Sequence, residues 1–207
     1  MANVNRPGGL SPHEYLDGSP WNGKGRWYWV ATNEGHNLAI GDPVTMSGTG
    51  DARGVPGVQL ATAGTGNLVL GAITGSAGGI YGGPGAIPGA LETTILSSAT
   101  RTADRYVFVA DDPNILFEIQ EGGAGTSLDQ QALAGNFNLL LGTNNGYISG
   151  WLLDNASQGI GATQQLQLMR AVQRIDNTLP VAGSAATYTK WLVRINYHQW
   201  NGGVVGI

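Results

Sequence analysis

Two pairs of carboxylates lie close together in the sequence, a spacing that could support acid–base chemistry. Asp111 directly precedes Asp112, and Glu118 lies shortly before Glu121. Two carboxylates that flank a glycosidic bond can supply the general acid and the base or nucleophile of a hydrolase. Adjacent residues on a strand point to opposite faces, however, and Asp112 precedes Pro113 in an expected turn, which gives it a structural role. A hydrolase built on a β-barrel is therefore the weakest of three functional hypotheses.

The other candidate residues give little support for a metal site or a nucleotide-binding site. His13, His36 and His198 are remote from one another in the sequence and form no local metal-binding motif. Residues 18–25, GSPWNGKG, match a phosphate-binding P-loop except that Gly25 replaces the Ser or Thr that holds Mg²⁺. We predict neither a strand before this segment nor a helix after it. We therefore expect no catalytic residues, no cofactor and no metal ion, and a protein that is not an enzyme.

The composition argues against several further classes of function. Of 207 residues, 34 are Gly, only 12% are charged and none is Cys, which favours a β-fold with many turns and excludes disulfides and thiolate metal sites. The net charge is -4 and the 10 Lys and Arg residues are scattered, so we expect no nucleic acid binding. No apolar run suits a signal peptide or a membrane span. We expect a protein made in a cytoplasm that binds no membrane.

Alternating apolar and polar residues indicate strands through most of the chain. The clearest stretch is 105–121, RYVFVADDPNILFEIQE, which predicts a β-hairpin with its turn at Asp111–Asn114. Residues 164–175 fit a helix or a strand, and we predict a strand because the context is all-β. We expect an all-β fold, a sandwich or jelly-roll-like barrel of short antiparallel strands with long Gly-rich loops. Further strands are expected at 38–46, 58–61, 68–74, 137–141, 151–155 and 188–196.

Two segments stand out from a single predicted β-domain at residues 38–207. Residues 1–37 lack periodicity yet contain four clustered aromatic residues, Trp21, Trp27, Tyr28 and Trp29. Because aromatic rings favour burial, we interpret this segment either as an extended arm that docks on this chain or a neighbour, or as a local cluster that caps the core. Residues 75–89 predict a protruding Gly- and Pro-rich loop. Its candidate contact residues are Ile80, Tyr81 and Ile87.

Three stretches resemble the head cement, or decoration, proteins of tailed bacteriophages: residues 105–121, WLVRINYHQW at 191–200 and LVLGAIT at 68–74. The resemblance implies a β-rich, non-enzymatic protein that binds the outside of the capsid as a dimer or trimer and clamps neighbouring copies of the major capsid protein. It also implies a location on the outer surface of the virion, after synthesis in the host bacterial cytoplasm. The aromatic and apolar residues of the two segments above are then candidate contacts with the capsid or with a second copy.

A carbohydrate-binding module or a host-adsorption protein of a phage virion is the alternative hypothesis. A β-sandwich that bears Trp side chains can stack them on sugars, and Trp27 and Trp29 are the candidates here. The residues alone leave the strand order and the choice between dimer and trimer open.

Overall fold

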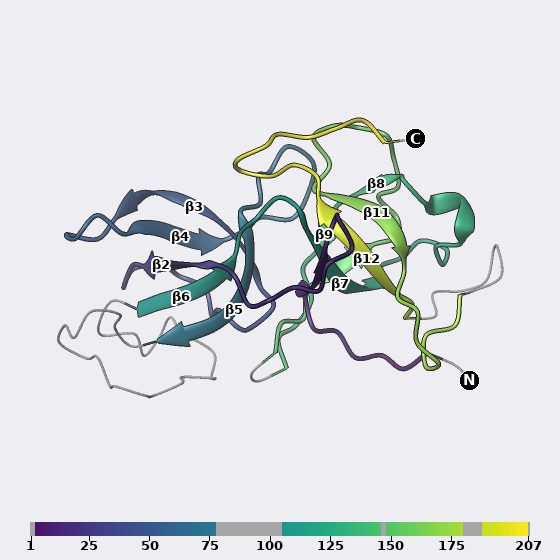
Figure 1. Ribbon diagram of the computed structural model, residues 1–207, viewed down its shortest axis with the longest axis horizontal. Coiled ribbons are helices and arrows are strands. Elements are labelled where there is room, and N and C mark those ends of the chain that lie inside the picture. Colours follow the sequence, from purple (N-terminus) through teal and green to yellow (C-terminus); the bar gives the residue numbers. More distant parts are fainter. Residues whose placement is uncertain (1–2, 78–104, 146–147, 180–187, 207) are drawn as a thin grey trace.

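The computed structural model contains two β-bodies, a closed barrel and a second sheet (Figure 1). The structure describes residues 3–77, 105–145, 148–179 and 188–206. Around the barrel the strands follow the order β2-β4-β3-β5-β6. These strands are β2 (Arg26–Val30), β3 (Pro43–Gly50), β4 (Pro56–Leu60), β5 (Gly71–Ala77) and β6 (Arg105–Ala110).

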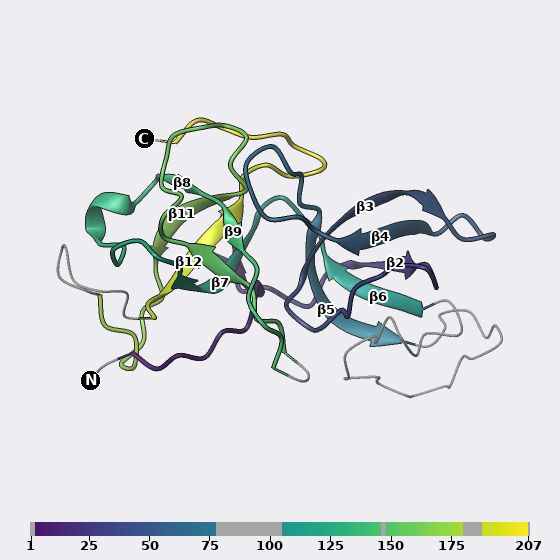
Figure 2. The ribbon, with the colours of Figure 1, turned by 180° about the vertical axis from the view of Figure 1, so that it is seen from behind.

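The second body is a sheet in the order β8-β11-β12-β7-β10-β9, and β1 also pairs with β7. Seen from behind, this sheet lies beside the barrel and both chain termini are on its side of the molecule (Figure 2). A short 3-10 helix, η1 (Gln130–Ala132), precedes β8. The strands of this body are β1 (Ser11–Tyr15), β7 (Ile115–Gly122), β8 (Asn136–Phe137), β9 (Leu139–Leu140), β10 (Leu152–Asp154), β11 (Leu166–Ala171) and β12 (Lys190–Ile195).

The expected all-β fold with a barrel is confirmed, and the structure contains a closed barrel and a second sheet. The ambiguous segment 164–175 contains β11 and is therefore a strand. Two strand pairs, β2–β4 and β7–β10, are parallel and so differ from the antiparallel pairing expected. In both pairs the intervening chain is long enough for the crossover that parallel strands require.

Each body has an apolar core, and the two cores meet. Tyr28 and Val107 are buried inside the barrel. The larger core lies against the sheet and contains Trp151 and Trp191, both almost fully buried. Leu60, at the end of β4, packs against both cores. The barrel and the sheet are therefore joined by apolar packing as well as by the chain itself.

The hairpin predicted at 105–121 is wrong. β6 pairs with β2 and β5 in the barrel, whereas β7 pairs with β1, β10 and β12 in the sheet. The turn residues do act as expected, since the amide of Asn114 donates to the carboxylate of Asp112 over 2.9 Å. Both strands are rich in apolar residues and each is central in its own sheet, so alternation alone did not specify the pairing partner. The segment links the two bodies.

Residues 1–37 also differ from the predicted extended arm. β1 pairs with β7, β2 lies between β4 and β6, and Leu10 belongs to the larger core. Residues 26–30 form a strand because inward and outward positions alternate over this short stretch between Gly-rich flanks. Tyr28 and Val30 face the barrel core, and the Trp residues on either side of Tyr28 face outward. No domain boundary falls at residue 37, because β2 is a barrel strand.

The predicted Gly- and Pro-rich loop at 75–89 begins inside a strand, since β5 extends to Ala77. The rest of that segment, with Ile80, Tyr81 and Ile87, lies outside the described residues.

A buried carboxylate lies where the chain passes from the barrel to the sheet. Asp111 directly follows β6, is 3% exposed, accepts a hydrogen bond from the Tyr28 hydroxyl over 2.5 Å and forms an ion pair with Nε of Arg26 over 2.8 Å. Both partners are on β2, so one carboxylate ties β2 to the connection between β6 and β7. Burial, followed by the hydrogen bond to Asp111, raises the pKa of Tyr28, which keeps its hydroxyl protonated and able to donate.

A buried histidine from the C-terminal segment packs near the same connection. His198 is 1% exposed, and its Nδ1 accepts a hydrogen bond from the backbone amide of Trp200 over 3.0 Å. The residues on either side of His198 form backbone hydrogen bonds with Val69, which precedes β5. Burial lowers the pKa of His198, more strongly than the nearby charge of Asp111 raises it. The imidazole is therefore neutral at pH 7.

Tyr28→Phe should lower the free energy of unfolding by about 1–3 kcal/mol, because the buried Asp111 carboxylate would lose a hydrogen-bond donor. Tyr15→Phe is the matched control, since the Tyr15 hydroxyl bonds to the exposed Asn22 and its loss should cost less than about 0.5 kcal/mol. Urea unfolding followed by tryptophan fluorescence measures both variants. Equal losses would contradict the role assigned to Asp111.

Stability should also fall as the pH drops below 6.5, the ordinary pKa of histidine. The unfolded chain binds a proton at His198 there, whereas the folded chain, whose His198 pKa is lower, does not. Urea midpoints measured between about pH 7.5 and 5.5, above the range where most carboxylates titrate, would reveal the decline. His198→Asn should flatten it. An unaltered decline in His198→Asn would show that other groups cause it.

Candidate interaction surface

Four aromatic side chains lie on the outer face of β2 and β6. In the register of these two strands, Trp27 is opposite Phe108 and Trp29 is opposite Tyr106. Directly opposed residues share a face of a sheet, and the alternate residues, such as Tyr28, are in the barrel core. The four therefore point away from that core. We call Trp27, Trp29, Tyr106 and Phe108 the outer aromatic row.

Trp27 is the most exposed member of the outer aromatic row. It is 36% exposed, and its ring meets that of Phe108 edge to face, with centroids 5.2 Å apart and an interplanar angle of 62°. Such a pair contributes about 0.5–1.5 kcal/mol beyond its buried area. The contact holds the Trp27 indole in one orientation while part of its surface stays open to solvent.

Trp29 and Tyr106 form the more covered end of the row. The Trp29 indole lies over Gly57 of β4, where a Cβ atom would come within 2.9 Å of Cε3 of the indole. The Tyr106 hydroxyl donates to Asp51 over 2.6 Å, and this hydrogen bond lowers the pKa of the Asp51 carboxyl. Nε1 of Trp29 is buried and has no hydrogen-bond partner among the described residues. This end of the row is fixed by packing on the barrel.

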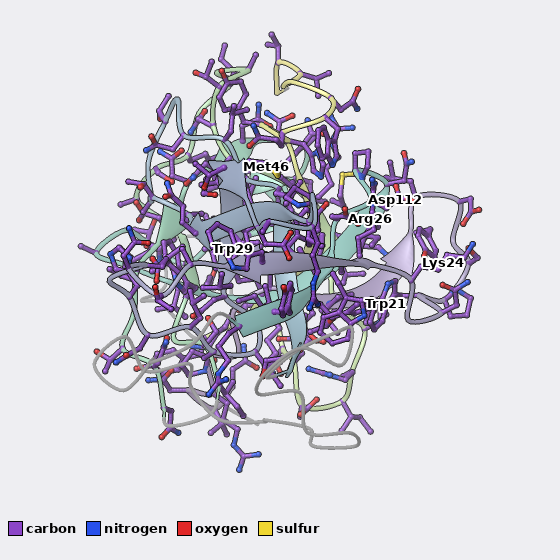
Figure 3. The ribbon with its side chains drawn as sticks, turned by 90° about the vertical axis from the view of Figure 1, so that its left-hand side faces the viewer. Trp21, Lys24, Arg26, Trp29, Met46 and Asp112 are labelled. Atoms are coloured by element: carbon purple, nitrogen blue, oxygen red, sulfur yellow. The ribbon has the colours of Figure 1, made fainter. Side chains whose placement is uncertain are left out.

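A second aromatic contact lies at the start of β2. The guanidinium carbon of Arg26 is 6.0 Å from the centroid of the Trp200 ring, which is half exposed. Seen from the end of the barrel, Arg26 lies with Lys24 and Asp112 on one side, and Trp29 lies on the other (Figure 3). The Arg26 end of β2 and the Trp29 end of the outer aromatic row are thus separate parts of the surface.

A groove of about 420 Å³ runs between the N-terminal segment, β5 and β7. Its walls are mainly apolar, and they include Trp21, which packs against the larger core. Arg6, Glu118 and Lys190 supply its charged groups. Glu118 is already paired with Lys190 over 3.1 Å and with Arg174 over 2.7 Å. The groove therefore offers apolar surface with few unpaired charges.

The carboxylates considered for acid–base chemistry have structural partners. Asp111 is bound by two β2 side chains, Asp112 accepts the amide of Asn114, and Glu118 forms two ion pairs. Glu121 is fully buried and accepts hydrogen bonds from Nε1 of Trp191 and the amide of Leu128, each over 3.1 Å. Each carboxylate thus holds strands or turns in place.

The predicted contact residues separate into four groups. Trp27 and Trp29 are on the outer aromatic row, Tyr28 is buried in the barrel core and is not a surface contact, and Trp21 lines the groove. Ile80, Tyr81 and Ile87 lie outside the described residues. Tyr106 and Phe108 were not predicted as contacts. The alternation in 105–110 did place Tyr106 and Phe108 on one face of their strand. Which residues lie beside them on the neighbouring strand depends on the strand register.

No protein-family description matches the chain, and no curated protein or solved structure matches it either. Within the described ranges, no helix has the length and apolarity to cross a membrane. The same ranges contain no cluster of three or more His, Cys, Asp or Glu side chains arranged to hold a metal ion.

Trp27→Ala should leave the fold intact, with a loss of about 1–2 kcal/mol from the broken pair with Phe108. Trp191→Ala should cost about 3–5 kcal/mol, because Trp191 is fully buried in the larger core. Urea unfolding of the two variants checks the difference. A loss in Trp27→Ala as large as in Trp191→Ala would place Trp27 in the core and contradict its assignment to a binding surface.

Proposed function

We propose that the protein is a cement, or decoration, protein of a tailed bacteriophage, which binds the outer surface of the major capsid protein lattice and stabilises the head. The observation that carries this proposal is the outer aromatic row, in which Trp27 and Phe108 remain partly open to solvent on the outside of the barrel. The resemblance of residues 68–74, 105–121 and 191–200 to that family supports it.

The chemistry of the outer aromatic row suits a protein partner. Large aromatic side chains are enriched among the residues that contribute most to protein–protein binding, and they lose little conformational entropy when they are already held by packing. Trp27 is held by Phe108, and Trp29 by the close approach of Gly57. The row is therefore preorganised before the capsid is bound.

Several copies would act together on a capsid. A dimer or trimer that contacts several capsid subunits gains avidity, because each contact after the first forms at a high effective concentration. A modest affinity per copy then links neighbouring capsid subunits across the lattice. In this proposal the protein is made in the host cytoplasm, has no enzymatic role, and resides on the outside of the virion.

Sugar stacking on Trp27 and Trp29, the alternative hypothesis, is less favoured by the geometry of the row. Stacking needs an open aromatic face, whereas Trp29 is half-buried over Gly57 and Trp27 is held edge to face by Phe108. The outer aromatic row is better suited to inserting between the side chains of a protein partner.

Trp27→Ala and Phe108→Ala should each weaken capsid binding about 30-fold or more, the loss typical of a central interface aromatic. The measurement is co-sedimentation of purified protein with undecorated capsids assembled from the major capsid protein of the phage to which, in this proposal, the protein belongs. Point substitutions are preferred to truncation, because β1 and β2 are part of the two bodies.

Ile175→Ala is the matched control, since Ile175 is 92% exposed but follows β11 in the sheet body. It should leave capsid binding unchanged. Undiminished binding by folded Trp27→Ala and Phe108→Ala proteins would remove the outer aromatic row from the proposed interface.

A further inference from the structure

A second concave site lies at the end of β1, where two turns meet. Its volume is about 460 Å³, and it is bounded by the turn after β1 and by the turn between β6 and β7. We call it the β1-end pocket. It shares none of its lining residues with the outer aromatic row or with the groove. Its lining consists of Tyr15, Leu16, Asp17, Ser19, Pro20, Asn22, Lys24, Asp112 and Asn114.

Hydrogen bonds hold both walls of the β1-end pocket in place. The backbone amide of Leu16 donates to the carbonyl of Asn114 over 2.8 Å, which joins the two turns. Asp17 accepts the amide and the hydroxyl of Ser19 over 2.8 and 2.6 Å. The Tyr15 hydroxyl donates to Oδ1 of Asn22 over 3.1 Å. The pocket is therefore formed before any ligand arrives.

These contacts use only one polar atom of each side chain. Asp17 and Asp112 each bond through Oδ1, which leaves Oδ2 of both carboxylates as acceptors. Asn22 accepts through Oδ1, which leaves its side-chain NH₂ as a donor. The ammonium group of the exposed Lys24 has no partner among the described residues. The residues that line this one small volume thus include free donors and free acceptors.

The charges of the β1-end pocket decide which ligand it suits. Two carboxylates and one ammonium give a net negative lining, which repels phosphate even though Lys24 belongs to the P-loop-like segment 18–25. A neutral ligand with many hydroxyl groups can donate to the carboxylates and accept from the amide and the ammonium. Tyr15, Leu16 and Pro20 add apolar surface for the C–H face of a sugar ring.

We propose that the β1-end pocket binds a neutral saccharide, with Asp17 and Asp112 accepting from its hydroxyl groups and Asn22 and Lys24 donating to them. This site is independent of capsid binding, because it does not involve the outer aromatic row. On a capsid-bound protein it would give the virion surface a weak affinity for glycans, which many copies would strengthen.

The test is a titration of the full-length, ¹⁵N-labelled protein with methyl glycosides of glucose, galactose, mannose and N-acetylglucosamine, followed by NMR. At least one glycoside should shift the backbone amides of residues 15–24 and of Asn114. Asp112→Asn should weaken that binding about tenfold or more, because a hydrogen bond to a charged acceptor is lost. Lys24→Gln should weaken the binding as well. Because the Lys24 side chain is exposed and its ammonium has no partner among the described residues, this variant keeps the test valid if Asp112→Asn does not fold.

Asp129→Asn is the matched control for Asp112→Asn. Both aspartates are half-buried and accept the backbone amide two residues later, over 2.8 Å for Asp129 and 2.9 Å for Asp112. Asp129→Asn should not change saccharide binding. The proposal is overturned if none of the glycosides binds, if the shifts appear on the outer aromatic row, or if inorganic phosphate shifts the same amides more strongly. None of these outcomes alters the capsid co-sedimentation result.

Discussion

The contact of Asp111 with Arg26 and Tyr28 is the constraint on which the two-body structure depends. It buries one carboxylate at the point where the chain leaves the barrel for the sheet, and both of its partners come from β2. An unpaired buried carboxylate would be costly, so β2 must stay in register with β6. That register in turn sets Trp27 opposite Phe108 on the outside of the barrel.

The buried contact of Asp111 also positions the outer aromatic row and the β1-end pocket. Tyr28 points inward to Asp111, so its two Trp neighbours point outward. Asp111 also fixes the start of the turn that contributes Asp112 to the β1-end pocket. The proposed capsid-binding surface and the proposed saccharide site are thus both positioned by one buried junction. Two apolar cores that share Leu60 give that junction a rigid support.

Much of the local structure could be predicted from the sequence, whereas the pairing could not. Alternation placed strands at 105–110 and 188–196, and the Asp112–Asn114 hydrogen bond followed from turn chemistry. The hairpin failed because two apolar strands can each pair with any suitable neighbour. Phe108 and Tyr106 could be assigned to the same outer face as Trp27 and Trp29 only once β2 was known to lie beside β6. The β1-end pocket joins turns that are about a hundred residues apart in the sequence, which local patterns do not reveal.

The most direct measurement of the central claim is an electron microscopy map of decorated capsids in which the barrel and the sheet can be placed separately. The proposed function predicts that the outer face of β2 and β6 lies against the major capsid protein, with Trp27 and Phe108 buried in the contact. A map in which that face is open to solvent, while the sheet body or the groove contacts the capsid, would contradict it.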